Sequence, residues 1–402
     1  FVKDIKLNFN MASKLLSNVM PTYGNKTIEF VKGKGCYLYT SQNKKYLDFA
    51  SGIAVNSLGH CHPKLIEALN KQSKQLWHVS NLYKIKKQEQ FAKLLCKNSF
   101  ADKVFFTNSG TESIECGIKI IRGYHSYHKT KKTEIITFDG AFHGRTYGAL
   151  SAQKNKKYSN GFGPMLKGFK QIEFNNEKKL ISAINKKTAG IIIEPIQGEG
   201  GIRPANLSFL KLLRKICNEK KILLFFDEVQ CGFGRSGKLF SHEWAKIKPD
   251  IMSVAKGIGS GFPLGACMST NKACVAMTKG SHGSTYGGNP LAMSVGLEVL
   301  KIISNKKFLS KVDKTARYFW KILKKLENTS NIISEVRGAG LLLGIKTNIS
   351  NIDFSEQLKK NKLLNVPAAD NTVRLAPPLI VSYKEIDKSI AIIKRSLKEL
   401  SR

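Results

Sequence analysis

The chain has 402 residues, 42% of them hydrophobic, and a formal net charge of +37 at pH 7. This length and apolar content suffice for a large core, in two domains or in one large domain with a smaller companion. No apolar run approaches the roughly 18 residues of a membrane span, which excludes a membrane-spanning protein, and we expect a soluble protein of the cytoplasm.

The positive charge does not by itself predict a nucleic-acid partner. Lysines are scattered through nearly every segment, and no basic strip interleaved with aromatic residues and no helix-turn-helix pattern accompanies them. A lysine-rich solvated surface is therefore favoured over a nucleic-acid interface, although such a surface attracts anionic substrates.

The eight cysteines are dispersed, with no C-x-x-C pair, which indicates a reducing compartment and no disulfide framework. The cluster His60-Cys61-His62 could be taken for metal ligands. Adjacent residues rarely point at one ion, no second cluster completes a ligand set, and Pro63 follows. We therefore expect a turn at this position and no bound metal.

The first 60 residues predict one part of a small domain. Residues 1–10 precede Met11, and we expect them either to lie upstream of the true start or to form a loose arm. Asp4, with no arginine nearby, argues against a transit peptide. The stretch VKGKGCYLYTSQNKKYLDFASG at residues 31–52 predicts two short strands around a turn.

From about residue 100 to 270, short apolar runs alternate with helical stretches. The runs that predict strands are KVFFTNSG, TEIITFDG, AGIIIEPIQ, KILLFFDEV and DIMSVAK. Nearly continuous apolar strands separated by helices indicate an α/β fold, a mostly parallel sheet with helices on both faces. Ligands of such sheets lie at the carboxyl ends of the strands. The runs end in small or polar residues that together predict a pocket: Asn108-Ser109-Gly110, Asp139-Gly140, Glu194-Pro195, Asp227-Glu228 and Ala255-Lys256.

The last part of the chain predicts long amphipathic helices and the strands VRGAGLLLGIK and NTVRLAPPL. We expect both chain ends to build one smaller α+β domain. The predicted division is an N-terminal segment of the small domain at residues 1–60, a large domain at 61–289, and a C-terminal part of the small domain at 290–402.

The stretch KILLFFDEVQCGFGRSGK at residues 221–238 invites comparison with a nucleotide-hydrolysing site. Gly232 to Lys238 supply most of the phosphate-loop pattern G-x-x-x-x-G-K-[ST]. Leu239 takes the place of the final Ser or Thr, so no hydroxyl is present for magnesium, and the acidic strand precedes the loop, which reverses the usual order. An NTPase is therefore disfavoured, and Asp227 needs another role.

Lys256 and Asp227 suggest a different chemistry. Lys256 ends an apolar strand and precedes a glycine-rich run, where its amine is partly desolvated and suited to Schiff-base formation. Asp227 ends the preceding predicted strand, and a cap or turn role would not explain the apolar KILLFF run before it. A pyridoxal phosphate enzyme needs a lysine that forms the Schiff base and a carboxylate that keeps the pyridine nitrogen protonated. For Lys256 alone, a surface lysine in a flexible loop is the alternative.

Ser109-Gly110-Thr111 is the candidate phosphate site. It opens a helix after a strand, so its backbone N–H groups and hydroxyls face an anion. A capping box that ends at Glu112 is the alternative interpretation, and it is compatible with the same geometry.

Seven stretches carry a resemblance to a known family. They occur in this order over nearly the whole chain, and the ordered set is highly specific: NSGTESIE, FDGAFHGRT, EPIQGEGG, FFDEVQCGFGRSG, AKGIGSGFPLGA, HGSTYGGNP and VRLAPPL. The chain resembles the class III, ornithine-type, pyridoxal phosphate-dependent aminotransferases. Within that family, SGIAVNSLGHCHP at residues 51–63 and AFHGRT at 141–146 are most similar to the acetylornithine aminotransferases.

The resemblance implies a role for each cofactor residue. Lys256 matches the lysine that forms the aldimine and then moves a proton, and Asp227 matches the partner of the pyridinium nitrogen. Gln230 matches an amide that binds the ring oxygen, and Phe142 the aromatic residue stacked on the ring, although Phe142 alone would otherwise be placed in the core. The implied phosphate ligands are Ser109, Gly110 and Thr111, with Thr285 lent by the neighbouring subunit.

The resemblance also implies a homodimer with shared sites and a set of substrate residues. Arg145 and Arg374 match the two readers of substrate carboxylates, for which a planar guanidinium is suited. Glu199 matches a glutamate that pairs with Arg374 and swings away for 2-oxoglutarate, and Ser284 matches a substrate contact. For each of these residues a purely structural ion pair or contact is the alternative.

The implied enzyme is a dimeric fold-type I aminotransferase. It moves an amino group between N2-acetyl-L-ornithine and 2-oxoglutarate in arginine biosynthesis, and bacterial members often also process succinyldiaminopimelate. An ornithine δ-aminotransferase, or another ω-amine aminotransferase, remains the alternative because it shares every cofactor residue. An NTPase and a nucleic-acid-binding protein remain the alternatives from other classes.

Overall fold

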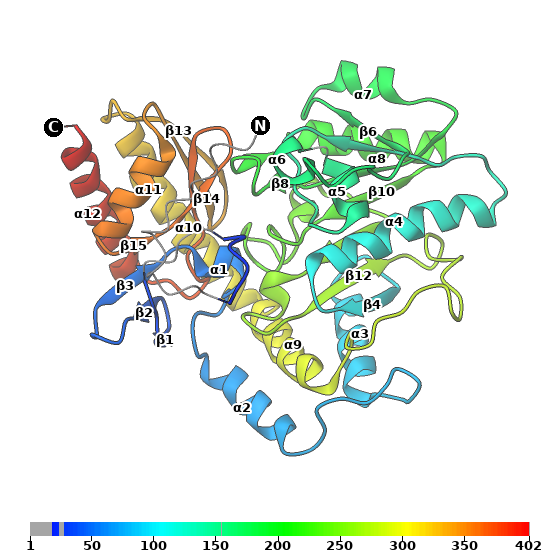
Figure 1. Ribbon diagram of the computed structural model, residues 1–402, viewed down its shortest axis with the longest axis horizontal. Coiled ribbons are helices and arrows are strands. Elements are labelled where there is room, and N and C mark those ends of the chain that lie inside the picture. Colours follow the sequence, from blue (N-terminus) through cyan, green and yellow to red (C-terminus); the bar gives the residue numbers. More distant parts are fainter. Residues whose placement is uncertain (1–17, 24–27, 154, 402) are drawn as a thin grey trace, which may run out of the picture.

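The computed structural model describes residues 18–23, 28–153 and 155–401, so the expectations for residues 1–10 concern a segment outside this range. Figure 1 shows two lobes, with helix α9 (Pro290–Ile303) between them. One lobe contains a seven-stranded sheet and its helices. The other lobe combines strands from the beginning and the end of the described chain.

The seven-stranded sheet is the centre of the larger lobe, and its strand order is β4-β12-β11-β10-β7-β5-β6. Strands β11, β10, β7, β5 and β6 are parallel, whereas β12 runs antiparallel to both of its neighbours. The predicted mostly parallel α/β sheet is therefore confirmed. The strands are β4 (Lys103–Thr107), β5 (Glu134–Phe138), β6 (Phe169–Ile172), β7 (Thr188–Ile193), β10 (Leu223–Asp227), β11 (Ile251–Val254) and β12 (Gly265–Ser269).

Helices cover both faces of this sheet, which explains the continuous apolar runs of its strands. In β10, Leu223 and Phe225 pack into one hydrophobic cluster, with residues of α4 (Gly110–Tyr127). Leu224 and Phe226 pack into the other cluster, with residues of α8 (Leu207–Lys220). Because successive side chains point to opposite faces, every position of the strand is buried.

Shorter elements complete this lobe. The helices are α2 (Pro63–Ser73), α3 (Lys86–Lys97), α5 (Tyr147–Gln153), α6 (Lys156–Ser159) and α7 (Glu177–Ala183), with 3-10 turns η2 (Ser241–Ala245) and η3 (Lys256–Ile258). Strands β8 (Ile196–Gln197) and β9 (Arg203–Pro204) form a small hairpin. Helix α9 packs against α2 and α3.

The smaller lobe contains two four-stranded sheets. The first joins β1 (Lys32–Lys34), β2 (Tyr37–Tyr39) and β3 (Lys45–Asp48) to β15 (Leu363–Leu364), so distant parts of the chain pair there. The second contains β13 (Ile333–Ala339), β14 (Leu342–Thr347), β16 (Val366–Ala368) and β17 (Thr372–Leu375). The helices are α1 (Ser51–Ala54), α10 (Lys306–Glu327), α11 (Asn351–Lys360) and α12 (Tyr383–Leu400).

Three details differ from the sequence-based expectations. Residues 31–52 form three strands, not two, because the backbone reverses at Gly35 as well as near Asn43, both with positive φ. VRGAGLLLGIK is not one strand but most of the β13–β14 hairpin, which turns at Gly340. Strands β12 and β6 had not been predicted.

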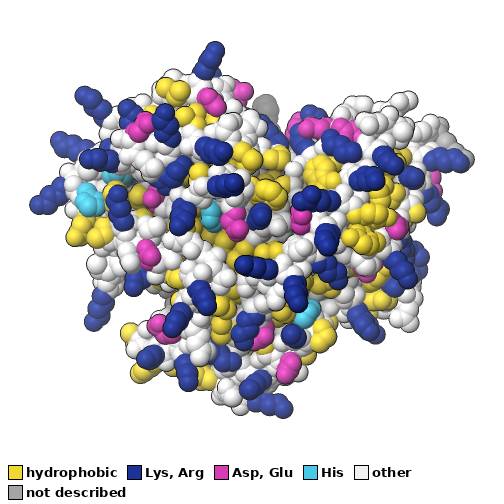
Figure 2. Space-filling model, turned by 180° about the vertical axis from the view of Figure 1, so that it is seen from behind, with side chains coloured by type: hydrophobic (Ala, Val, Ile, Leu, Met, Phe, Trp, Pro, Cys, Tyr) yellow, Lys and Arg dark blue, Asp and Glu magenta, His cyan; other side chains and the backbone are white. Residues whose placement is uncertain are grey.

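The surface agrees with a dispersed positive charge on the face that can be seen. Figure 2 shows Lys and Arg side chains spread over this face, without a continuous strip of them. No helix within the described ranges is long and apolar enough to cross a membrane.

Helix α4 approaches the sheet most closely at Gly117. A Cβ atom there would lie 2.2 Å from Cε1 of Phe225, far inside van der Waals contact. We expect Gly117→Ala to lower the free energy of unfolding by about 1–3 kcal/mol, because overpacking outweighs the gain of about 1 kcal/mol in helix propensity. The measurement is chemical denaturation. The control is Ser126→Ala on the exposed side of α4, and equal stability of the two variants would contradict this packing.

Candidate active site

A cavity of about 380 Å³ lies at the carboxyl ends of β7, β10 and β11 and at the N-terminus of α4. Ligands of open α/β sheets bind at the carboxyl ends of the strands, and the cavity lies there. It collects most of the residues predicted to form the site: Ser109, Gly110, Thr111, Phe142, Arg145, Glu199, Asp227, Gln230 and Lys256.

Lys256 follows β11 and has a positive φ of 50°. Its amine makes no hydrogen bond or ion pair to a described residue, although carboxylates lie near it. Burial lowers the pKa of Lys256 to about 8, and the positive charge of Arg374 acts in the same direction, against the nearby carboxylates. Much more of this amine is therefore uncharged near neutral pH than for a lysine with the ordinary pKa of 10.5, which makes it a stronger nucleophile.

Asp227 ends β10, and its carboxylate is fixed at both oxygens. Oδ2 lies 2.7 Å from Nδ1 of His143, and Oδ1 accepts a hydrogen bond of 3.0 Å from the backbone N–H of Val229. Burial lowers the pKa of His143, but the hydrogen bond and the charge of Asp227 outweigh it, so the net shift is upward. The protonated form of His143 is thereby favoured, and the ring holds the carboxyl group of Asp227 in place.

His143 and Glu194 also line this cavity, and neither had been assigned a chemical role from the sequence. Oε1 of Glu194 accepts from Phe142 N at 2.9 Å, and Oε2 accepts from Gly198 N at 3.0 Å. Glu194 therefore ties together the two loops that carry Phe142 and Glu199. Burial, helped by the charge of Asp227, raises the pKa of Glu194 to about 7. The sequence did offer one clue, since His143 lies inside the motif AFHGRT.

The N-terminus of α4 presents backbone donors to the cavity. The N–H groups of Gly110 and Thr111 make no hydrogen bond to any described residue, as expected for the first turn of a helix. The hydroxyl of Ser109 donates to Oε2 of Glu112 at 2.8 Å and also accepts from Glu112 N at 3.4 Å. Ser109 therefore caps the helix, and an anion here would be held mainly by the main chain.

The hydroxyl of Thr111 is also engaged. Thr146 donates to Oε1 of Glu115 at 2.5 Å, so the 2.9 Å contact between the two threonines needs Thr111 as its donor. A Cβ atom on Gly144, whose φ is 133°, would lie 2.2 Å from Oγ1 of Thr111. Only glycine allows the loop after Phe142 to pass so close to the helix.

Phe142 and Arg145 occupy one side of the cavity. Phe142 contacts Tyr158 edge to face, with 5.7 Å between ring centroids. The guanidinium of Arg145 lies 3.8 Å from the Tyr158 ring centroid and 5.5 Å from that of Phe142. Arg145 is exposed and has no ion-pair partner within the described residues, so its charge is available to a ligand.

Arg374 lies on β17 and is almost fully buried, with a side-chain exposure of 1%. Its Nη1 donates to Oε1 of Glu199 at 2.6 Å and to Oε1 of Gln230 at 2.8 Å. Nε and Nη2 are buried without a partner among the residues that the structure describes. Arg374 therefore retains donors for a second carboxylate.

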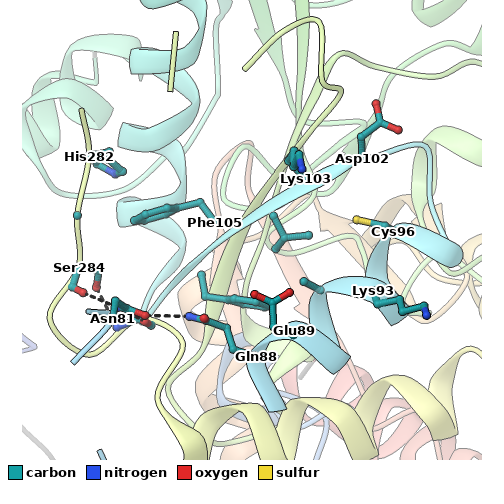
Figure 3. Close-up of a pocket in the computed structure, with 15 residues that line it drawn as sticks. Asn81, Gln88, Glu89, Lys93, Cys96, Asp102, Lys103, Phe105, His282 and Ser284 are labelled. Atoms are coloured by element: carbon teal, nitrogen blue, oxygen red, sulfur yellow. Dashed lines mark hydrogen bonds between the residues drawn. The ribbon is translucent and has the colours of Figure 1, made fainter. Parts of the chain in front are cut away.

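Ser284 and Thr285 do not line this cavity. Ser284 lines a larger hollow of about 690 Å³ beside the edge strand β4 and helix α3, which Figure 3 shows. Asn81 donates there to the backbone oxygens of Ser284, at 3.0 Å, and Gly287, at 2.9 Å. Thr285 is exposed. Among the predicted cofactor residues, Thr285 is the one that this chain does not bring to its own cavity.

The stretch that resembles a phosphate loop and the cluster His60-Cys61-His62 both lie outside the cavity. Lys238, at the end of the false phosphate loop, is exposed and lies 5.2 Å from the ring of Trp244. His60 binds Asp48 at 2.7 Å, while Cys61 is exposed in a turn of positive φ. No group of three or more His, Cys, Asp or Glu side chains that could hold a metal ion occurs in the described part of the chain.

Comparison with known proteins identifies the family. The family model for aminotransferase class III matches residues 19–397. The acetylornithine aminotransferase of Brucella melitensis is 49% identical over 383 residues, which cover 94% of this chain and 95% of that protein. The protein of the same name from Clostridium acetobutylicum is 44% identical over 384 residues, covering 95% of this chain and 99% of that one.

Solved structures agree with this family. The N-acetylornithine aminotransferase of Stenotrophomonas maltophilia superposes with a TM-score of 0.83 at 31% identity, covering 95% of this chain and 98% of that chain. An ornithine aminotransferase of Toxoplasma gondii, with PLP at partial occupancy in its active site, gives a TM-score of 0.89 at 29% identity and covers 94% and 92%. The chain therefore belongs to the class III aminotransferases, whose cofactor is pyridoxal phosphate.

Proposed function

We propose that this protein transfers an amino group between N2-acetyl-L-ornithine and 2-oxoglutarate, a step of arginine biosynthesis. Identity of 44–49% to acetylornithine aminotransferases over nearly the whole chain supports this substrate. The observation that carries the proposal is one cavity that contains an unpaired lysine of lowered pKa and a buried carboxylate, with an arginine that retains unused donors nearby. Succinyldiaminopimelate is a second proposed donor.

The residues of the cavity fit pyridoxal phosphate. The amine of Lys256, unpaired among the described residues, suits covalent attachment, and the carboxyl group of Asp227, held by His143, suits the pyridine nitrogen. The unused N–H groups of Gly110 and Thr111 suit the phosphate. We further propose Phe142 as the ring-stacking residue and Gln230 as the partner of the ring oxygen, with Ser109 acting through its cap on α4.

When bound, pyridoxal phosphate supplies an electron sink for the carbon that carries the amine. Lys256 has the protein's own part in that chemistry, because its amine can both bind the cofactor and carry a proton at this carbon. Asp227 would be the partner of the pyridine nitrogen, and His143 holds the carboxyl group of Asp227 in place at 2.7 Å. Phe142 lines the cavity with an apolar ring, which would help to exclude water from it.

The two arginines are proposed to divide the work of binding carboxylates. An acetylated donor presents its carboxylate far from the reacting amine, whereas 2-oxoglutarate presents carboxylates at both ends. We assign the distal carboxylate of either substrate to Arg145, and the carboxylate beside the reacting carbon of 2-oxoglutarate to Arg374. Glu199, which binds Arg374 at 2.6 Å, would be displaced from this contact by 2-oxoglutarate.

A homodimer is proposed because this chain does not complete its own site. Thr285 and Ser284 lie outside the cavity and belong to a surface with exposed apolar side chains. Those side chains are Leu76, Trp77, Leu82, Tyr83 and Tyr286, whose exposure ranges from 46% to 87%. A monomer rarely leaves such a cluster uncovered. A second copy would cover this surface and supply Thr285 to the phosphate and Ser284 to the substrate.

The division of the chain also remains a proposal, with a large domain at 61–289 and a small domain built from 1–60 and 290–402. The pairing of β15 with β3 supports a small domain made from both ends. A cytoplasmic location is proposed because all eight cysteines are free thiols, which fits a reducing compartment.

The proposed donor is tested by comparing kcat/KM for four amines with 2-oxoglutarate: acetylornithine, ornithine, succinyldiaminopimelate and 4-aminobutyrate. We expect acetylornithine to give the highest value. A higher value for ornithine would instead assign the protein as an ornithine δ-aminotransferase, which shares the cofactor residues.

Replacing Lys256 tests the cofactor site. Lys256→Ala should leave a folded protein to which borohydride no longer fixes the cofactor, and transamination should fall by several orders of magnitude, because nucleophile and proton carrier are lost together. Mass spectrometry of the reduced chain measures the attachment. The control is Lys238→Ala, which should behave as the unmodified protein does, and a cofactor found on Lys238 would refute the assignment.

The division between the arginines is tested by single-turnover titration of each half-reaction. Removing a charged partner costs roughly 2–5 kcal/mol when the other charge stays buried. Arg145→Ala should therefore weaken substrate binding in both half-reactions, with the amino donor and with 2-oxoglutarate. Arg374→Ala should weaken mainly the binding of 2-oxoglutarate. Equal losses in both half-reactions of Arg374→Ala would overturn the proposed division.

A further inference from the structure

The loop Gly198–Ile202, which carries Glu199, is poorly fixed by its own hydrogen bonds. It forms the tip of the hairpin between β8 and β9. Gly201 N and Ile202 N both reach Gly198 O, but at 3.4 Å, which is long for an N–H···O bond. Gly201 and Ile202 also have positive φ values, 104° and 54°, and Ile202 has a Cβ atom that disfavours this conformation. Contacts outside the loop must therefore hold its shape.

Glu194 holds the start of this loop through Gly198 N, and two short bonds from the smaller lobe hold the rest of its backbone. Ala369 N donates to Glu199 O at 2.9 Å, and Nε of Arg337 donates to Gly201 O at 2.7 Å. A Cβ atom on Gly201 would lie 2.6 Å from Ala369 O and from Nη2 of Arg337, so the loop passes as close as glycine permits. The only side chain in these two contacts is that of Arg337.

Arg337 is itself held rigidly. Nη1 lies 2.8 Å from Oδ2 of Asp370 and 3.1 Å from Oε2 of Glu335, and Nη2 donates to the hydroxyl of Thr372 at 3.0 Å. The side chain is only 12% exposed. All three partners lie on or beside β13 and β17, so Arg337 transmits the position of that sheet to Gly201.

The backbone of Arg374 is held by strand pairing that does not involve the side chain of Arg337. It lies within β17, where it pairs with Gly344 on one side and with Val366 on the other. Loosening Gly201 would therefore move Glu199 while leaving Arg374 in place. The local concentration of the Glu199 carboxylate at the guanidinium would fall, and an incoming carboxylate would face a weaker competitor.

We propose that Arg337 is a positioning residue for substrate recognition: by holding Gly201 it keeps Glu199 against Arg374, and it thereby sets how strongly a substrate carboxylate must compete for that arginine. This inference rests on the proposed roles of Arg374 and Glu199. It predicts that a change outside the cavity alters the preference between dicarboxylate and monocarboxylate substrates without altering the attachment of the cofactor.

The test is calorimetric titration of the cofactor-loaded enzyme with glutarate, a dicarboxylate that has neither an amine nor an oxo group to react. Arg337→Met removes the guanidinium and keeps an unbranched side chain. We expect it to tighten glutarate binding by about threefold to tenfold. Asp370→Asn, which frees Arg337 without removing it, should act in the same direction but less. The control is Arg317→Met, an exposed arginine paired with Asp313 on α10, which should leave the affinity unchanged.

A double-mutant cycle separates positioning from a general structural effect. Glu199→Ala removes the competitor, so adding Arg337→Met to it should change glutarate affinity by less than about twofold. Unchanged or weakened binding in Arg337→Met alone, or an equal change in the Glu199→Ala background, would overturn the proposal. If Arg374→Ala left the affinity for glutarate unchanged, Arg374 would not be the residue that binds its carboxylate. The proposed role of Arg337 would then be refuted together with that of Arg374.

Discussion

The covering of both faces of the seven-stranded sheet is the constraint from which the rest of the structure follows. Helices α4 and α8 bury opposite sides of β10, so no position within that strand can bear a charge without a cost. Polar groups are displaced to the carboxyl ends of the strands, where the chain leaves the sheet. Asp227, Glu194 and Lys256 all occur there, and the cavity lies where these ends meet.

The charges gathered in this way are balanced in pairs, and the balance gives each group a different character. His143 compensates Asp227, and Glu199 compensates Arg374, so neither buried charge is isolated. Lys256 has no such partner among the residues that the structure describes, and its pKa is lowered to about 8. Glu194 lies close to Asp227, and its pKa is raised to about 7. The unpaired amine is thus the reactive group because its neighbours are already engaged.

Much of this arrangement could be predicted from the sequence, for a physical reason. A strand that is buried on both faces must be apolar throughout, so KILLFF and AGIII were recognisable, and the residues that end such runs had to be near one another. Strand β12 was missed because its sequence GACMS is short, small and preceded by a glycine-rich loop. Nor does any local pattern reveal that it runs antiparallel.

The role of His143 could not be read from the sequence alone, because it depends on a contact with Asp227, 84 residues away. Glu194 was predicted to end a strand at the pocket, but its partners were not predicted. The backbone N–H groups that donate to it belong to two loops that come together only in the folded chain. The hydroxyls of Ser109 and Thr111 were expected to face an anion. Both are engaged within the protein, through Glu112 and through Thr146.

That engagement has a thermodynamic consequence. With both hydroxyls occupied, the donors that α4 itself retains for a phosphate are the amides of its first turn, and these exist as a set only while that turn is formed. A cofactor bound to these amides would therefore stabilise the turn, and opening of the turn would weaken cofactor binding. Amide hydrogen exchange at the start of α4 would slow as the cofactor binds, and mutations that fray the helix would weaken retention of the cofactor without touching it.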